Sequence, residues 1–138
     1  MDIDECINLG YLKRIKPSQD LVEKELKEAK YDIDMAEGSY NNKDYKWSTI
    51  KAYYAIFHSA RAVLFKLGFQ EKRHFAISIV LEDLNKKGKL EIKYINYFNA
   101  ALSSREDADY HYISSKERAH HNIELAKEFY NKMLELTK

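Results

Sequence analysis

Apolar side chains recur at helical spacing over most of this chain. After Ser18 they stand three or four residues apart, from Val22 to Tyr40, and the positions between them are largely Glu, Lys and Asp. One apolar stripe among charged residues is the pattern of an amphipathic helix that packs against a core. We therefore predict a helix that begins at Ser18, which suits an N-cap, and ends at the polar residues 41–43.

The segment from about Asp44 to Leu67 differs, because its apolar residues cover most of the helical circumference. One stripe comprises Trp47, Ile50, Tyr54, Phe57 and Leu64, and another comprises Tyr53, Ile56, Ala60, Val63 and Leu67. A helix that is apolar on most sides is buried by several neighbours, or by neighbours and a partner chain. We predict that this segment is the central helix, with Gly68 as its C-terminal stop.

The same periodicity predicts four further helices. They are a short one at 2–9, one at 74–87, one at 90–103, and a last one that follows a capping box, Ser114-x-x-Glu117, and runs to the C-terminus. The polar segments 69–73 and 104–113 are predicted to be connections. Helices joined by short connections pack antiparallel, so the predicted fold is all-α: an up-and-down bundle of four to five helices with a short N-terminal helix.

Composition supports this fold class. The chain has 138 residues, and we expect a single domain over 1–138, with residues 1–17 as a short N-terminal extension. Four glycines and one proline are too few for the turns of a sheet-rich fold. An apolar content of 45% argues against disorder.

Charge and cysteine content bear on partners and location. Basic residues number 23 and acidic residues 22, a net charge of +1, so any affinity for RNA depends on local patches such as Lys66, Lys72 and Arg73. Cys6 is the only cysteine, which excludes an internal disulfide. No apolar run approaches the ~18 residues that span a bilayer, and the acidic start lacks the layout of a signal peptide. We expect a cytoplasmic protein that makes no use of a membrane.

Metal and cofactor chemistry have little support. The chain offers two Glu-x-x-His spacings, Glu71 with His74 and Glu117 with His120. A di-iron bundle also needs inward carboxylates on two other helices, and the core face of the first long helix shows none. The glycines are scattered singly, so no phosphate-binding loop is present. We predict no metal and no cofactor.

Two polar residues, His58 and Arg61, interrupt the central helix on one face. Their burial is costly unless each has a partner. Two explanations stay open. Either they pair with a carboxylate of a neighbouring helix, such as Asp107 or Asp109, or their face opens onto a polar cleft.

The segment from Arg105 to Tyr112 concentrates ionisable groups. An arginine grips a phosphate bidentately, and a histidine such as His111 moves a proton near neutral pH. Together they suffice for metal-free cleavage of RNA by its own 2′-hydroxyl. In a continuous helix, six positions separate them by about 120°. They converge only if the helix ends between them or if a second subunit supplies the other group. The alternative is a capping and salt-bridging loop.

Residues 53–64, YYAIFHSARAVL, resemble the central-helix signature of the HEPN (higher eukaryote and prokaryote nucleotide-binding) family. The short stand-alone prokaryotic branch of that family is similar in further features: His74 near the start of the next helix, the connection at 86–90, Arg-x-x-Ala-Asp-Tyr at 105–110, and Glu117-Arg118-Ala119 in the last helix. The resemblance covers about residues 20 to 135.

The resemblance implies a helical bundle that forms homodimers. Many HEPN members are metal-independent ribonucleases with an Arg-x(4–6)-His motif, which Arg105 and His111 fit. It implies that Arg105 holds the phosphate and that His111 is the general acid or base, with the motifs of two subunits facing each other across a cleft. Asp109, Tyr110 and Tyr112, with His58 and Arg61, would support nucleotide or RNA binding.

Three functions stay open from the sequence. The first is an endoribonuclease, the toxin of a pair whose antitoxin is a minimal nucleotidyltransferase that modifies Tyr112 or Tyr110. The second is a non-catalytic HEPN module that binds a nucleotide or a nucleotidyltransferase partner. The third is a purely structural helical adaptor.

Overall fold

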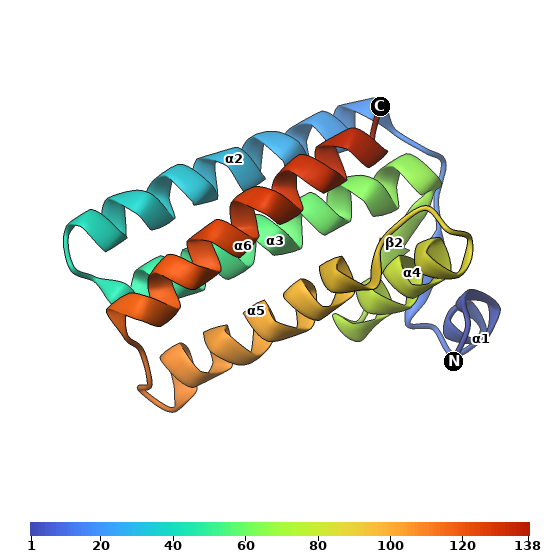
Figure 1. The fold of residues 1–138 in the computed structure, drawn as a ribbon. Coiled ribbons are helices and arrows are strands. Elements are labelled where there is room, and N and C mark those ends of the chain that lie inside the picture. The colour runs from blue at the N-terminus through green and yellow to red at the C-terminus, as the bar shows by residue number, and fades with distance from the viewer.

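The computed structural model describes all residues from Met1 to Lys138 and confirms the all-α bundle (Figure 1). The elements are α1 (Ile3–Asn8), β1 (Leu12–Arg14), α2 (Gln19–Asn41), α3 (Tyr45–Leu67), β2 (Phe69–Glu71), α4 (Phe75–Lys86), α5 (Ile92–Tyr110) and α6 (Lys116–Leu136). The long helices α2, α3, α5 and α6 run up and down alongside one another, and the short α1 and α4 lie at the end that carries the strands (Figure 1). The short N-terminal helix is present as predicted.

The helix α3 is central, as its apolar pattern predicts. It contacts α2, α5 and α6, and Ile56 and Leu64 are fully buried. Small buried residues, such as Ala36 on α2 and Ala52 on α3, let these two helices approach closely. At this close contact the Ser48 hydroxyl donates a hydrogen bond to the Ala36 carbonyl at 2.9 Å.

Two short strands, which the sequence pattern did not predict, join the end of α3 to the N-terminal segment. The strands β1 and β2 pair antiparallel, with Leu12 opposite Glu71. Gly68 permits this arrangement, because it ends α3 with a φ of +87° and because a Cβ there would lie 3.0 Å from the Ile15 carbonyl oxygen. Only glycine meets both demands without strain. The predicted loop 69–73 is therefore a strand in its first three residues.

The helix α5 is longer than predicted, because it continues past Ser103 to Tyr110. Two ion pairs at i,i+4 spacing, Arg105–Asp109 and Asp107–His111, support these last turns. Ala108 between them is fully buried. The predicted connection 104–113 is therefore wrong over most of its length, and the true connection spans residues 111–115.

The helix α6 begins one residue later than predicted. Ser115, not Ser114, is the N-cap, and its hydroxyl accepts a hydrogen bond from the backbone N–H of Arg118 at 3.1 Å. The predicted Ser114–Glu117 capping box is therefore wrong. Glu117 still lies in the first turn of the helix, where a carboxylate is stabilised by the helix dipole.

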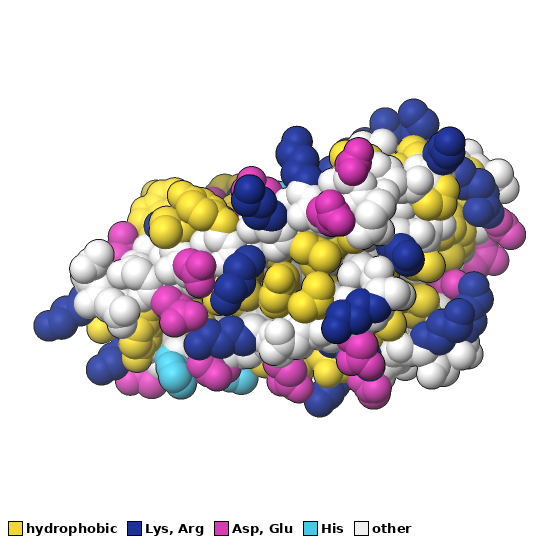
Figure 2. Space-filling view, turned by 90° about the horizontal axis from the view of Figure 1, so that it is seen from above, with side chains coloured by type: hydrophobic (Ala, Val, Ile, Leu, Met, Phe, Trp, Pro, Cys, Tyr) yellow, Lys and Arg dark blue, Asp and Glu magenta, His cyan; other side chains and the backbone are white.

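The surface carries charges of both signs. Figure 2 shows Lys and Arg side chains interspersed with Asp and Glu over the face seen from above, with apolar side chains exposed between them. No helix of the structure combines the length and the low polarity that crossing a bilayer requires.

Candidate functional site

Arg105 lies in a cage of three tyrosine rings between α5 and α3. Its guanidinium carbon is 5.7 Å from the ring centre of Tyr53, 5.8 Å from that of Tyr54 and 5.3 Å from that of Tyr110. A guanidinium over an aromatic face is held by the electrostatics of the ring. The signature of the central helix and the Arg-x-x-Ala-Asp-Tyr motif therefore meet at one place.

Two polar contacts hold the Arg105 guanidinium, and both use the same nitrogen. Nη2 donates a hydrogen bond to the Tyr54 hydroxyl at 3.3 Å and lies 3.5 Å from the Asp109 carboxylate. Nη1 has no partner in the chain, and Nε is buried without one. The guanidinium thus keeps one unpartnered donor, Nη1, that an incoming anion can reach, whereas Nε is closed off by its burial.

The Arg105 cage continues inward to His74. The His74 Nε2 is hydrogen-bonded to the Tyr53 hydroxyl, and its ring stacks on Phe57 and Phe98, with centroids 5.3 Å away in each case. Burial, with a smaller contribution from the Arg105 charge, lowers the pKa of His74, and burial raises the pKa of Tyr53. His74 is therefore neutral at pH 7.

We expect His74 to make the protein less stable in mild acid. Its pKa is lowered from 6.5 in the folded state, so as the pH falls through that value the unfolded chain takes up a proton that the folded chain does not. This proton uptake favours unfolding, and the loss of stability continues down to the folded pKa. Thermal unfolding at about pH 7.5 and about pH 5.5 should show a smaller drop in Tm for His74→Gln than for the wild type. The exposed His121 supplies the control, His121→Gln, and equal drops in all three proteins would contradict the assignment.

His111 is the C-cap of α5, and its imidazole is held by Asp107. Nδ1 lies 3.1 Å from one Asp107 oxygen, and the other oxygen accepts a hydrogen bond from Arg118 at 3.0 Å. Arg118 also donates to the Ser104 hydroxyl at 3.1 Å. Hydrogen bonds from His111 and Arg118 lower the pKa of Asp107. The imidazole is thus oriented by an anchored carboxylate, while its Nε2 has no partner and its side chain is 62% exposed.

Arg105 and His111 do not meet within one copy of the chain. The helix is continuous between them, so they point in directions about 120° apart. Each has its own carboxylate, Asp109 for Arg105 and Asp107 for His111, and no hydrogen bond or ion pair joins the two. The helix does not bring the two residues together. Its two ion pairs and the His111 C-cap fit the predicted alternative, a capping and salt-bridging segment, and convergence would need a second copy.

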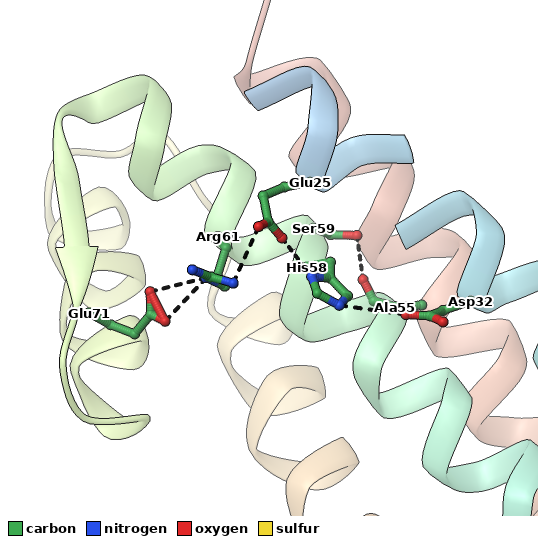
Figure 3. Close-up of polar contacts among 7 residues, drawn as sticks. All are labelled: Glu25, Asp32, Ala55, His58, Ser59, Arg61 and Glu71. Atoms are coloured by element: carbon green, nitrogen blue, oxygen red, sulfur yellow. Dashed lines mark hydrogen bonds and ion pairs between the residues drawn. The ribbon is translucent and has the colours of Figure 1, made fainter. Parts of the chain in front are cut away.

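His58 and Arg61 lie on α3 among carboxylates of α2 and β2 (Figure 3). The two nitrogens of His58 face Glu25 at 2.5 Å and Asp32 at 3.7 Å. The Arg61 guanidinium lies 3.2 Å from Glu25 and 3.2 Å from Glu71. These five side chains, which we call the α3 ion cluster, join α2, α3 and β2.

Pairing with carboxylates was one of the two explanations open for His58 and Arg61. The partners suggested from the sequence, Asp107 and Asp109, are wrong, because the end of α5 uses those carboxylates for its own residues. No hydrogen bond or ion pair connects the α3 ion cluster with Arg105. With three carboxylates around one guanidinium and one imidazole, the cluster repels a phosphate rather than attracting it.

Glu25 is the residue of the α3 ion cluster that sequence reasoning missed. We expected no carboxylate on the core face of this helix, and that expectation is wrong, since the Glu25 side chain is only 9% exposed. A signal was available, because residues 22, 25 and 29 share one face of a helix. Arg118, which anchors Asp107, was also missed. For this residue the sequence gave no comparable signal.

Tyr112 lies apart from the Arg105 cage, whereas Asp109 and Tyr110 contact the guanidinium directly. Tyr112 has a left-handed backbone, with a φ of 56°, and its side chain is 83% exposed. The Lys46 ammonium sits 5.7 Å from the centre of its ring. The chain reversal after α5 therefore leaves this tyrosine open to solvent.

The two Glu-x-x-His spacings do not assemble into a shared site. Glu71 pairs with Arg61, and His74 with Tyr53. His120 packs at the ring of Tyr40, with centroids 5.9 Å apart. No three His, Cys, Asp or Glu side chains are grouped closely enough to hold a metal ion.

The fold and this arrangement define a helical-bundle protein with a caged arginine and a carboxylate-held histidine near the end of α5. The model of the HEPN domain matches residues 22–136, which include α3, α5 and α6 and all but the first three residues of α2. The chain therefore belongs to the HEPN family, as the resemblance of its central helix predicted.

One relative is known under a functional name. The protein called "Putative toxin MJ0142" of Methanocaldococcus jannaschii is 26% identical to this chain over 90 residues. The match covers 64% of this chain and 61% of that protein, so the chain spans about three fifths of the length of the curated relative it matches.

Proposed function

We propose that this chain is a metal-independent endoribonuclease that acts as a homodimer, with Arg105 of one copy and His111 of the other at each site. The observation that carries the proposal is the His111–Asp107 pair. Its geometry, with Nδ1 on the carboxylate at 3.1 Å and Nε2 unpartnered on an exposed side chain, suits a general acid or base that is held in one orientation.

The proposed reaction is transesterification within RNA. The imidazole Nε2 takes the proton of a ribose 2′-hydroxyl, and the 2′-oxygen attacks the neighbouring phosphorus. The bond from phosphorus to the 5′-oxygen breaks, and that oxygen receives a proton. The products are a 2′,3′-cyclic phosphate and a 5′-hydroxyl, and water is not consumed. Arg105 offsets the charge on the phosphate oxygens, for which its unpartnered Nη1 is available.

The exposed aromatic side chains near the Arg105 cage support a dimer. Trp47 is 47% exposed, Tyr54 36% and Tyr110 61%. Trp47 and Tyr54 are seven residues apart on α3 and share a face, and Tyr54 and Tyr110 flank the Arg105 guanidinium. Exposed aromatic clusters beside an arginine are typical of protein interfaces. A second copy on this face would bring its own His111 toward the cage.

The carboxylates near Arg105 oppose the binding of a phosphate at this site. Asp109 must give up its 3.5 Å contact with the guanidinium when a phosphate binds, and Glu106 follows Arg105 directly in the chain. The pair is partly buried, with side chains 21% and 31% exposed, so a bound phosphate has to replace this contact with a charge-assisted hydrogen bond of its own.

The test is incubation of EDTA-treated protein with mixed cellular RNA, followed by analysis of the ends. We expect cleavage that leaves cyclic phosphates, and a decrease of about 10²–10⁴-fold for His111→Ala and a similar decrease for Arg105→Ala. The matched control is His121→Ala, since His121 is an exposed histidine on α6, and it should cut like the wild type. RNA that stays intact with the wild type, or activity that survives in His111→Ala, would refute the proposal.

A second candidate, the non-catalytic module, is favoured by the Asp109 contact on Arg105. In that case Arg105 organises a protein surface, and RNA stays intact with every variant.

The toxin role is supported by the name of the relative. Tyr112 is the tyrosine that we propose an antitoxin nucleotidyltransferase would modify, because its side chain is the most exposed of the aromatic ones near the motif. Tyr112→Phe would then prevent the nucleotidyltransferase from attaching a nucleotide to this chain, while Tyr110→Phe would not.

A further inference from the structure

Six basic side chains gather at the end of the bundle that carries the strands. They are Lys13, Arg14, Lys16, Lys66, Lys72 and Arg73, and all are exposed. The segments that carry them, 11–20 and 66–73, hold six basic and two acidic residues, a net charge of +4, and the adjoining residues 2–5 add three carboxylates, Asp2, Asp4 and Glu5. In Figure 2, Lys and Arg side chains are frequent at the right-hand end, with Asp and Glu side chains among them; Figure 1 places β2 and the end of α3 at this end.

Backbone pairing brings these two segments together. Lys13 lies opposite Gln70 in the strand pair, and the N–H groups of Lys72 and Arg73 both donate to the Tyr11 carbonyl, at 2.8 and 3.3 Å. Residues more than fifty positions apart in the sequence thus share one surface. The sequence showed only half of it, the group at 66–73.

Most of these charges have no partner in the chain. Arg14 alone makes an ion pair, a 3.5 Å contact with the exposed Asp4. The nearest acidic residue of the strands, Glu71, is already held by Arg61. A surface of like charges that the protein does not neutralise is stabilised by an anionic ligand with several charges at regular spacing.

An exposed aromatic ring lies beside the basic side chains. Phe75, two residues after Arg73, is 43% exposed, and its ring packs edge-on against Tyr11 with centroids 5.1 Å apart. Basic side chains that hold a backbone, combined with an aromatic ring on which a base can stack, are the elements of single-stranded nucleic-acid binding.

We infer that this strand-end surface, made of the six basic residues and Phe75, binds single-stranded RNA outside the catalytic site. The inference rests on the proposed function, because it takes the substrate to be RNA. The surface lies about 20 Å from Tyr54 along α3, at 1.5 Å per residue, so it would hold a flanking part of the RNA rather than the phosphate that is cut.

The test measures binding of a fluorescent 2′-O-methyl oligouridine of about 12 nucleotides by anisotropy. This RNA lacks the 2′-hydroxyl and stays intact, so the unaltered full-length protein can be used. We expect Lys66→Glu/Lys72→Glu to raise Kd at least about tenfold. The slope of log K against log salt should also fall by about 1.4, because each phosphate contact on a single strand contributes about 0.7 to that slope and two contacts are removed. The matched control is Lys24→Glu/Lys27→Glu, which makes the same charge change at two exposed lysines of α2 that have no ion pair, and it should bind within about twofold of the wild type.

The aromatic part of the surface is tested separately. Phe75→Ala should weaken binding about tenfold without a change in the salt slope, because stacking is not ionic, and Phe75→Tyr should bind like the wild type. Thermal unfolding of each variant checks that the fold is kept. Wild-type affinity in the Lys66→Glu/Lys72→Glu variant overturns the inference, and so does a preference for anionic lipid vesicles or for an acidic peptide over the RNA.

The outcome separates this inference from the proposed nuclease activity. If the wild type binds the probe through this surface but cuts no RNA, the nuclease proposal fails and the inference stands. If cleavage depends on Arg105 while the Lys66→Glu/Lys72→Glu variant binds and cuts like the wild type, the inference fails and the nuclease proposal stands.

Discussion

A heterodimer of one Arg105→Ala copy and one His111→Ala copy should cleave RNA at about half the wild-type rate, although neither variant is active by itself. The two groups diverge within one chain, so in the proposed dimer each site would take its arginine from one copy and its histidine from the other. In the mixed dimer one of the two sites is complete. Two different affinity tags allow the heterodimer to be purified, and the release of cyclic-phosphate ends measures its rate.

The matched control places both substitutions on one copy and pairs it with a wild-type copy. If the sites are shared, both sites in this dimer lack one group and the activity is lost. If each chain has its own complete site, the same dimer keeps about half the activity and the first heterodimer has none. That reversed pattern, or a protein that stays monomeric at micromolar concentration, would contradict the shared site.

Replacement of Arg61 by methionine should lower the free energy of unfolding by about 3 kcal/mol, because it leaves Glu25 and Glu71 without their shared cation. The side chains of both glutamates are about nine-tenths buried, so water cannot replace the guanidinium fully. Addition of Glu25→Gln to the Arg61→Met variant should recover part of the loss. Urea unfolding of the three proteins gives the free energies.

Arg14→Met is the control for the Arg61 prediction. Both side chains of the Arg14–Asp4 pair are exposed, Arg14 to 63% and Asp4 to 83%. Exposed ion pairs contribute less than about 1 kcal/mol to the free energy of unfolding. Its loss should change the free energy of unfolding by no more than a few tenths of a kcal/mol. Equal losses for Arg61→Met and Arg14→Met would show that the α3 ion cluster contributes nothing through burial.

The periodicity of apolar residues was sufficient to predict the helices, because each long helix buries one stripe and that stripe is written into its own segment. The central position of α3 followed from its two stripes, and Gly68 marked its end. The strands could not be predicted in the same way. They pair residues 12–14 with residues 69–71, and a three-residue strand has too few positions to show an alternating pattern.

The candidate site could be predicted in part. Arg105 and His111 were proposed as site residues from their chemistry and spacing, but the sequence did not show which carboxylate each would contact. That depends on the length of α5, since only a helix that continues to Tyr110 brings residues four positions apart, Arg105 with Asp109 and Asp107 with His111, into contact. The tyrosine cage was hidden for another reason: Tyr53 and Tyr54 fit the apolar stripes of α3 equally well as core residues.

The helix α5 is uninterrupted from Arg105 to Tyr110, and this affects how the proposed activity would depend on the amount of protein in the cell. A single copy keeps Arg105 and His111 apart on this helix, so under the proposed shared site it would be inactive alone. While copies are scarce relative to the dimer Kd, the proposed rate of RNA cleavage would grow with the square of their abundance, and halving expression would lower it fourfold.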